Sequence, residues 1–298
     1  MVRYSLRQLA YMTETARSGG IAQAARQLNV STAAISAAID KLEDATGLTL
    51  FDRFPSQGVR LTRAGVEFAK QAEALLAQAR ALERNATDLS EGRRGAIHIG
   101  THFALAHRYV LPAVLAFRDS HPDVRIQVIE GSYTTLLDAL DTGKVDALVV
   151  FGQGLDSARH DIEVLRELPP LVLLAASHDL ATRDRLHISD LADMPYVDLD
   201  SSGPGPTYLS LLRAAGIHPQ VAFTSQSREL AQAYVGKGLG FTLVGFPAKQ
   251  GRTIDGDRVV ALPLHEEIGH FKAVIARARH IGRVDLVERF LDVCRAQC

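Results

Sequence analysis

One stretch near the amino end carries small or hydroxyl-bearing side chains along one helical face: Thr32, Ala33, Ser36 and Ala37. The opposite face is apolar, with Ile35, Ile39 and Leu42 at helical spacing. Ser31 stands where an N-cap belongs, because its hydroxyl can accept a hydrogen bond from an otherwise unpaired backbone N–H. A helix with so slim an outer face fits the major groove of DNA. The alternative is an ordinary helical hairpin in a core.

Three arginines are placed to accompany that helix. Arg26 belongs to the preceding helix, and Arg53 and Arg60 flank a predicted turn over residues 55–58. A two-stranded wing beside a groove-bound helix would bring the Arg53 and Arg60 guanidinium groups to the phosphates or to the adjacent minor groove. We therefore predict that they contact DNA, with solvated surface charges as the alternative.

A second set of residues follows the carboxyl ends of predicted strands or precedes predicted helices: Thr101, His102, Phe103, Ser132, Ser201, Ser202, Gln226 and Phe246. Strand ends and helix N-termini present unpaired N–H groups that attract anions. The set therefore predicts contacts to a small, negatively charged molecule. His102 could titrate near neutrality and help to bind an acid. For every member the alternative is a cap or turn residue that only satisfies backbone groups.

No catalytic set is evident. His265, His270 and His280 lack the spacing of metal ligands, and no CxxC occurs. A Gly-x-Ser-x-Gly elbow is also absent from the sequence. The glycines at 236, 238 and 240 lead into a predicted strand and do not open a phosphate-binding helix. We therefore expect neither an enzyme nor a metal ion or other cofactor.

The elements that must position the first set form a small head. An opening helix ends at Ser18-Gly19-Gly20. Two short helices then span 21–43, with a turn between them at Asn29 and Val30. A two-stranded wing follows at 48–61. Thr62 can cap a long helix from Arg63 to about Ser90. That helix has an apolar heptad seam: Phe68, Ala72, Leu75, Ala79, Leu82, Ala86 and Leu89. Such a seam predicts pairing with a second helix, and hence a dimer.

The remaining residues alternate between strand and helix patterns. Strands are expected at 96–100, 124–129, 145–151, 171–175, 196–199, 220–223, 240–244 and 271–276, and helices at 111–120, 134–142, 208–215, 230–236 and 284–295. This alternation predicts parallel strand pairing with helices on both faces of the sheet. Two similar half-sets, connected near Leu168 and near Ile268, predict two α/β lobes with a cleft between them.

Composition agrees with a multidomain globular chain. The sequence has 298 residues and a formal net charge of −1. Residues 1–94 hold 13 Lys/Arg against 10 Asp/Glu, a net charge of +3, so the remainder carries −4. A basic head is a mild indication of nucleic-acid contact. The two cysteines, Cys294 and Cys298, are interpreted as thiols in a reducing compartment. With no signal-peptide pattern and no apolar run of membrane-spanning length, we expect a cytoplasmic protein without membrane contact.

The head also carries family motifs. AAxxLxVSxxAISxxIxxLE covers residues 24–43, GxxLFxR covers 47–53 and GVRLTxxG covers 58–65. Residues 3–65 thereby resemble the winged helix-turn-helix of the LysR-type transcriptional regulators. The body resembles the effector-binding region of the same family through LPxxLxFxxxxPxV at 111–124, EGSxxxLLxxLxxGxxD at 130–146 and GLG at 238–240. The resemblance covers essentially the whole chain.

The resemblance implies an α/β fold class with an all-α-type winged helix-turn-helix head and a two-lobed α/β effector-binding body. We place the head at 1–65, the dimerisation helix and hinge at 66–94, and the body at 95–298. Lobe I takes 95–167 and 269–298, and lobe II takes 168–268. The implied partners are double-stranded DNA, an effector that is a small or aromatic organic acid, further copies of the chain as a dimer or tetramer, and RNA polymerase.

This chain departs from the family pattern in two places. The family often carries Gln or Pro after the capping serine and Arg or Gln after the second serine, whereas here those positions are Thr32, Ala33, Ala37 and Ala38. Bidentate base reading from this helix is therefore unavailable, and specificity should depend on Arg53, Arg60 and DNA shape. Phe246 stands where the family often has proline, which alters the expected pocket wall. An enzyme with an appended DNA head and a solute-binding protein without DNA are the competing hypotheses.

Overall fold

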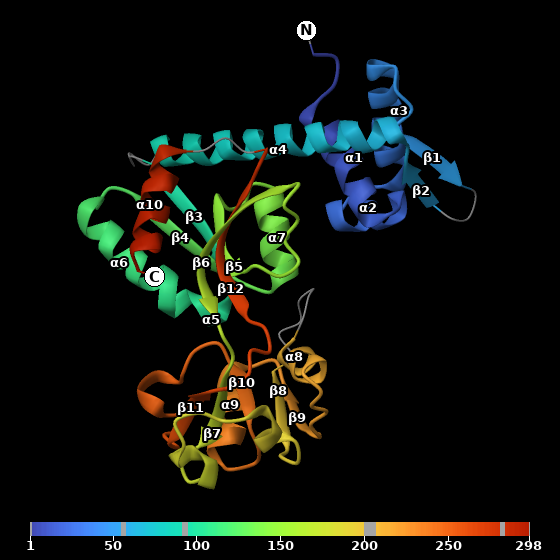
Figure 1. Cartoon of the computed structure of the whole chain (residues 1–298). Helices are drawn as coiled ribbons and strands as arrows, with labels where there is room; N and C mark the ends of the chain where they lie inside the picture. The colour runs from blue at the N-terminus through green and yellow to red at the C-terminus, as the bar shows by residue number, and fades with distance from the viewer. Residues whose placement is uncertain (1, 55–57, 91–94, 200–206, 281–283, 298) are drawn as a thin grey trace.

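The computed structural model of the chain describes residues 2–54, 58–90, 95–199, 207–280 and 284–297. A small head lies at one end of a long helix, and a body of two lobes lies below the other end (Figure 1). None of the helices in these ranges is both long enough and apolar enough to cross a membrane.

The head consists of α1 (Leu6–Ser18), α2 (Ile21–Leu28), α3 (Thr32–Thr46) and a hairpin of β1 (Phe51–Phe54) and β2 (Gly58–Leu61). Ser31 caps α3 as predicted, since its hydroxyl accepts from the N–H of Ala34 at 3.1 Å. Asn29 ends α2 in the left-handed region with φ 57°. The apolar face of α3 is fully buried as predicted, so the helix presents its opposite face outward.

Glu43 links the carboxyl-terminal half of α3 to the wing. Its Oε1 accepts hydrogen bonds from the N–H groups of Leu50 at 2.6 Å and Phe51 at 3.2 Å. Both of those residues are buried, so their amides would otherwise lack a partner in the core. Helix α3, whose outer face is exposed, therefore also sets the position of strand β1 in the wing.

Helix α4 (Arg63–Ser90) begins after Thr62, whose hydroxyl accepts from the N–H of Gly65 at 2.9 Å. The predicted seam has two different environments. Phe68 and Ala72 pack into the core of the chain's own head, so the prediction that they face a second helix is wrong. Leu75 and Leu82 are exposed, by 42% and 70%, and remain available to a partner. Leu89 lies among the positions whose side chains are not described.

Lobe I is built on a five-stranded sheet in the order β4-β3-β5-β12-β6. The strands are β3 (Ala96–Thr101), β4 (Arg125–Glu130), β5 (Ala147–Phe151), β6 (His160–Leu168) and β12 (Phe271–Ala278), and the helices are α5 (Phe103–Leu105), α6 (Leu111–Ser120), α7 (Tyr133–Asp141) and α10 (Asp285–Ala296). A π-helical turn, Ala106–Val110, joins α5 to α6.

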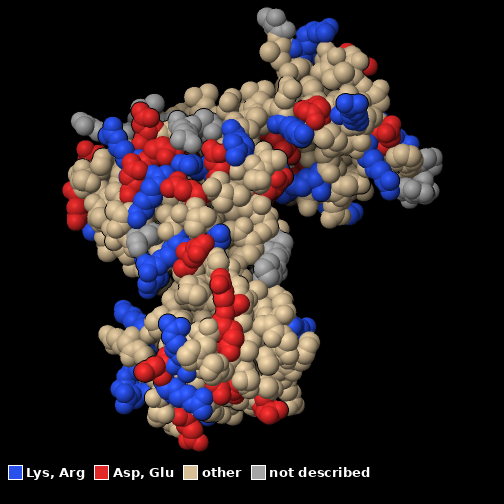
Figure 2. All heavy atoms as spheres, in the orientation of Figure 1, with Lys and Arg blue, Asp and Glu red and all other residues tan. Residues whose placement is uncertain are grey.

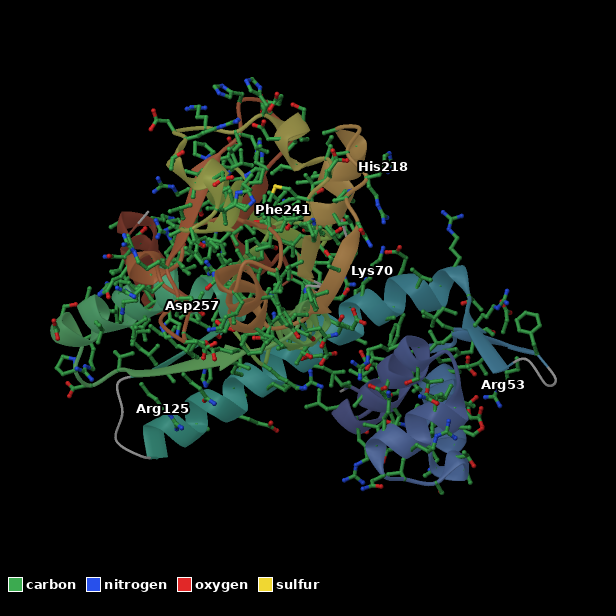
Figure 3. The ribbon with its side chains drawn as sticks, turned by 90° about the horizontal axis from the view of Figure 1, so that it is seen from below. Arg53, Lys70, Arg125, His218, Phe241 and Asp257 are labelled. Atoms are coloured by element: carbon green, nitrogen blue, oxygen red, sulfur yellow. The ribbon has the colours of Figure 1, made fainter. Side chains whose placement is uncertain are left out.

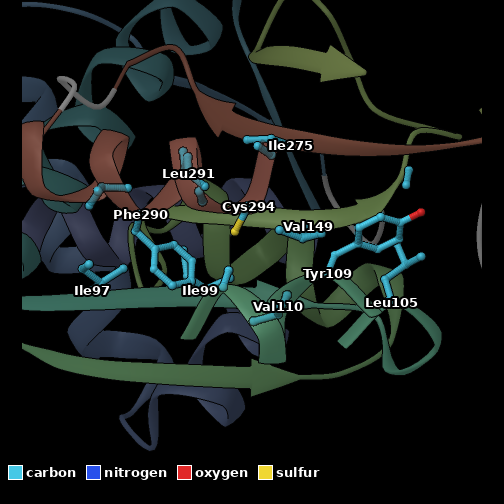
Figure 4. Packing of buried hydrophobic residues seen from close by; sticks show 14 of the residues in the cluster. Ile97, Ile99, Leu105, Tyr109, Val110, Val149, Ile275, Phe290, Leu291 and Cys294 are labelled. Atoms are coloured by element: carbon cyan, nitrogen blue, oxygen red, sulfur yellow. The ribbon is translucent and has the colours of Figure 1, made fainter. Parts of the chain in front are cut away.

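Alternate residues of the lobe I strands enter two cores, because successive strand side chains point to opposite faces. Val149 and Ile275 pack with Phe290 of α10 on one face (Figure 4). Leu148 and Val274 pack on the other face with α7. Helices thus cover both faces of this sheet, as the alternation predicted.

Lobe II contains β7 (Leu171–Ala175), β8 (Tyr196–Leu199), β9 (Val221–Ser225), β10 (Thr242–Val244) and β11 (Val259–Pro263), with α8 (Tyr208–Ala214) and α9 (Arg228–Gly236). The strand orders are β10-β7-β11 and β8-β9. A single bridge between Tyr196 and Phe241 connects the two sheets.

Strand direction differs in part from the prediction. β3 is parallel to β4 and β5, and β8 is parallel to β9, as expected. However, β12 is antiparallel to β5 and β6, and β7 is antiparallel to β10 and β11. For β12 the reason is topological, because the chain leaves lobe I through β6 and returns through β12 in the opposite direction. The alternation pattern also failed to reveal β6, which carries several charged residues, and β11, a short apolar strand that ends in a proline.

Helix α4 lies directly against lobe I beside the end of α7 (Figure 1). A Cβ placed on Gly143 would come within 2.9 Å of the Ala77 Cβ, and Ala77 is fully buried. Arg80 donates to the carbonyl of Thr142 at 2.7 Å. An ion pair between Arg17 of α1 and Asp138 of α7 joins the head itself to the same lobe.

We expect Glu43→Ala to destabilise the head by about 1–3 kcal/mol, because two amides near the core lose their acceptor. Glu43→Gln should lose less, since its amide oxygen can still accept. Thermal unfolding of the full chain followed by circular dichroism measures the change. Asp44→Ala, one residue further along α3, is the matched control, and an unchanged melting curve for Glu43→Ala would contradict the assigned link.

Candidate functional site

The outer face of α3 is open to a ligand. Thr32, Ala33 and Ala37 are exposed, and Ser36 is partly buried. The Ser36 hydroxyl lies at 3.5 Å from a guanidinium nitrogen of Arg53. The face therefore combines hydroxyl groups with methyl groups and has no long side chain of its own. Such a face can approach base edges closely, with hydroxyl contacts and with methyl contacts to thymine.

Arg26, Ser31 and Thr32 line one open hollow at the turn between α2 and α3. The Arg26 guanidinium donates to Gln23 at 2.5 Å on the exposed side of α2. The free N–H groups at the start of α3 and the Arg26 charge thus lie on the same surface. Both features favour a phosphate group.

The two wing arginines differ in their surroundings. Arg53 forms an ion pair with Asp40 of α3, so its charge is partly neutralised within the head. Arg60 lies opposite Asp52 in the hairpin register, and its guanidinium carbon lies 5.8 Å from the centroid of the Phe54 ring. Figure 2 shows exposed Lys and Arg side chains around α3 and the wing, and Figure 3 places Arg53 on the wing, far from Phe241 and Asp257 of lobe II.

A cavity of about 100 Å³ lies between the two lobes. Lobe I and lobe II both contribute to its wall: His102, Ala104, Tyr133, Phe151, Gln153, Leu199, Thr207, Tyr208, Arg228, Val244, Gly245, Phe246 and Phe271. The wall is mostly apolar and aromatic, with a few polar groups, as is usual for small-molecule sites.

Two of the predicted ligand-binding residues, His102 and Phe246, line this cavity. Ser201 and Ser202 lie outside the described residues. The remaining four do not line it: Thr101, Phe103, Ser132 and Gln226.

Their surroundings explain this placement. Thr101 is fully buried, and its hydroxyl donates to the carbonyl of Val149 at 2.9 Å. Phe103 and Gln226 are exposed. Ser132 caps α7 by accepting from the N–H of Thr135, which is the alternative role considered for it.

Arg228 is the functional candidate that sequence reasoning missed. Its guanidinium carbon lies 4.1 Å from the centroid of the Phe246 ring, and its Nη2 donates to the Phe246 carbonyl at 2.9 Å. Burial lowers the pKa of this guanidinium below its ordinary value. One sequence signal was present, because Arg228 is the first residue of α9, where a positive charge opposes the helix dipole. Such a local conflict is typical of functional positions.

Two further groups shape the polarity of the cavity. Burial lowers the pKa of His102, whose Nδ1 accepts from the N–H of Ala104 at 3.3 Å. Tyr133 is only 8% exposed, and burial raises its pKa to about 12. Its hydroxyl has no hydrogen-bond partner within the described part of the chain. The cavity therefore offers a neutral imidazole, a protonated phenol and a guanidinium to a bound molecule.

Comparisons with known proteins identify both the head and the body of the chain. The family model "Bacterial regulatory helix-turn-helix protein, lysR family" matches residues 6–66. The family model "LysR substrate binding domain" matches residues 90–298. Neither the described head nor the described lobes bring together three His, Cys, Asp or Glu side chains that could hold a metal ion.

Individual relatives match along most of their length. The chain is 30% identical over 264 residues to the transcriptional regulator CysB of Haemophilus influenzae, covering 86% of this chain and 79% of that protein. It is 29% identical over 294 residues to the regulator BudR of Raoultella terrigena, covering 97% and 99%. Among solved structures, HinK, a LysR family transcriptional regulator from Pseudomonas aeruginosa, has 31% identity, a TM-score of 0.63 and coverage of 99% and 98%.

The body should lose stability as pH falls. His102 has a folded-state pKa below its ordinary value of 6.5, so the folded protein binds a proton less readily than the unfolded chain. The resulting loss in free energy of unfolding is absent well above pH 6.5, where His102 is neutral in both states. It grows as pH falls below 6.5, because the unfolded chain then binds the proton more readily. Melting temperatures at pH 7.5 and 5.5 test this, and His102→Gln should show a smaller drop between the two values than the unchanged protein. Equal drops would contradict the assignment.

Proposed function

Since the chain belongs to the LysR family of transcriptional regulators, we propose that its activity is controlled by a small organic acid that binds between lobe I and lobe II. The family membership covers both parts, a DNA-binding head and a substrate-binding body. It also agrees with the expectation that the chain is not an enzyme, because the relatives compared above are regulators. The identity of the acid and the residues that bind it belong to the proposal.

The position of Arg228 in the wall of the cavity is the observation that supports the proposal most directly. A positive charge faces a mostly aromatic cavity, and no carboxylate lies within ion-pair distance of it in the described parts of the two lobes. Arg228 is partly buried, and the neighbouring Glu229 acts on its charge without forming an ion pair. A partly buried cation without an ion-pair partner is costly, whereas a bound carboxylate can form two parallel hydrogen bonds with a guanidinium. The aromatic wall favours a ligand with a flat apolar body. A small aromatic acid combines both features.

For DNA we propose that α3 enters the major groove, with Thr32, Ala33, Ser36 and Ala37 toward the bases. Arg60 contacts phosphate or the adjacent minor groove, and Arg26 and Ser31 approach a phosphate beside the α2–α3 turn. Arg53 also contacts a phosphate, and in doing so it gives up its ion pair with Asp40. Specificity then depends mainly on the wing and on DNA shape, since the helix has no side chain for bidentate base reading.

We further propose that Leu75, Leu82 and Ala86 on α4 pair the chain with a second copy, so that two heads read half-sites separated by a whole number of helical turns. A tetramer and contact with RNA polymerase are proposed from the family resemblance alone. The domain boundaries that we propose place the head at 1–65 and the paired helix and hinge at 66–94. Lobe I then takes 95–167 and 269–298, and lobe II takes 168–268. An effector that prefers one closure of the lobes would shift the spacing of the paired heads.

Arg60→Ala should weaken binding to a DNA fragment from the chain's own promoter. Loss of one phosphate contact should reduce the slope of log affinity against log salt by about 1. Fluorescence anisotropy across a salt series measures both quantities. Arg213→Ala, on the exposed side of α8 in lobe II, is the matched control. An unchanged slope for Arg60→Ala would show that this arginine does not contact phosphate.

Arg228→Met should weaken the binding of benzoate and related small carboxylates by about tenfold or more, because one charge-assisted interaction is lost. Arg228→Lys should retain part of the affinity through its charge. Thermal shifts of the full chain against a panel of such acids provide the measurement. DNA binding without ligand should be unchanged in both variants. A panel that stabilises the protein and Arg228→Met equally would contradict the role of Arg228, and a panel without effect would contradict an acid effector.

A further inference from the structure

The guanidinium group of Arg53 lies along the outer face of α3. It forms an ion pair with Asp40, and its Nη1 lies 3.5 Å from the hydroxyl oxygen of Ser36. Ser36 and Asp40 stand four residues apart, so their side chains lie on the same face of the helix. Arg60, by contrast, has its guanidinium carbon 5.8 Å from the centroid of the Phe54 ring, within the wing itself. The charge of Arg53 therefore already has a partner on α3 before DNA binds.

Asp40 places a carboxylate on the face that is proposed to enter the major groove. Its side chain is 52% exposed, and it follows Thr32 and Ser36 at helical spacing. At a rise of about 1.5 Å per residue, Asp40 lies about 12 Å along the helix axis from Thr32, which is comparable with the groove width of about 12 Å. The carboxylate therefore reaches the groove when Thr32 and Ser36 do.

A carboxylate in the groove is unfavourable unless it meets a hydrogen-bond donor. The flanking phosphates repel it, and it loses part of its hydration shell. In the complex proposed above, Arg53 moves to a phosphate, so Asp40 also loses its cation. A donor on the exposed base edges then has to offset the repulsion and the lost ion pair.

The four bases differ in what they present to a carboxylate. In the major groove guanine presents two acceptors, and thymine presents an acceptor and a methyl group, so neither can donate to Asp40. The amino groups of cytosine and adenine can donate, but the adenine amino group lies beside the N7 acceptor, whose lone pair repels a carboxylate. The N4 amino group of cytosine is thus the base donor that suits Asp40 best.

We propose that Asp40 is a specificity-determining residue that accepts a hydrogen bond from the N4 amino group of a cytosine at one position of each half-site. This inference rests on the proposed function, since it requires α3 in the major groove. At such a position Asp40 exchanges the guanidinium group for the cytosine amino group, and Arg53 is released to a phosphate. On other sequences the ion pair persists, and Arg53 adds nothing to the affinity.

This exchange makes a phosphate contact depend on the DNA sequence. Phosphate contacts carry no sequence information directly, because every base pair has the same backbone. An arginine that is released only by a base contact strengthens binding to the matching site without strengthening binding to other DNA. The Arg53–Asp40 pair is suited to such an exchange, because both side chains are about half exposed and exposed ion pairs contribute little to stability.

The base contact is tested by substituting each base pair in a DNA fragment from the chain's own promoter and measuring the affinity of the full chain by fluorescence anisotropy. One symmetry-related pair of C·G positions should cost the unchanged protein about tenfold in affinity when replaced, the usual effect of a mismatched base pair. Asp40→Ala should abolish that cost. Asp40→Asn should move the preference to adenine, because an amide can pair with adenine N6 and N7. Asp44→Ala, which removes an exposed acid one turn further along α3, is the matched control and should keep the cytosine preference.

The release of Arg53 is tested with the same fragment and with a scrambled fragment of equal length. Arg53→Met should reduce the slope of log affinity against log salt by about 1 on the promoter fragment and leave the slope on the scrambled fragment unchanged. When Asp40→Ala is also present, Arg53→Met should reduce both slopes, because Arg53 is then free to contact any phosphate.

The outcomes separate this inference from the proposed docking of α3. If Asp40→Ala strengthens binding to every sequence equally and the base preference stays, Asp40 acts only as a repulsive charge, and the inference is overturned while the docking stands. If Arg53→Met alone reduces both slopes, its release does not depend on sequence, and the inference fails in the same way. If no base substitution weakens binding of the unchanged protein, both proposals fail. Melting curves of each variant establish that altered DNA binding reflects the missing side chain and not an unfolded head.

Discussion

The close approach of α4 to lobe I is the constraint on which the arrangement of the molecule depends. Ala77 and Gly143 meet with so little space that a side chain on Gly143 would have to displace the helix. Gly143 also has φ +67°, a conformation that favours glycine. Two polar contacts add to this packing: Arg80 of α4 donates to the carbonyl of Thr142, and Arg17 of α1 forms an ion pair with Asp138 of α7. The head is thereby attached to the lobe whose helix α7 begins at the cavity with Tyr133 and ends beside α4 with Asp141.

The cavity exists because the chain crosses between the lobes twice. β6 leaves lobe I and β12 returns to it, and the two pair in antiparallel register over most of their length. This ribbon holds the lobes together while leaving their facing surfaces free. The wall of the cavity therefore combines residues that are far apart in the sequence, such as His102, Arg228 and Phe271. A cavity of this kind is sensitive to lobe closure, since neither lobe forms the site alone.

The head solves a different problem, because it must present a slim helix and hold a wing at a fixed angle beside it. Glu43 satisfies two amides of the wing, and Arg53 pairs with Asp40 on the same helix. The side chains that link wing and helix thus include one that is proposed to meet DNA. The lack of long polar side chains on the outer face moves base recognition toward the wing and the shape of the duplex.

The sequence by itself determined the family and most of the helices and strands, although it missed β6 and β11. Periodicity placed α3, α4 and α7 nearly to the residue, and Ser31, Thr62 and Ser132 were each in position to cap a helix, because caps and hydrophobic stripes are local properties. Tertiary structure decided strand direction, the environment of Phe68 and Ala72, and most of the cavity wall. Thr101 is buried against Val149, whereas Arg228 reaches the ring of Phe246. These outcomes depend on which distant segments meet when the lobes fold, and no local pattern records that.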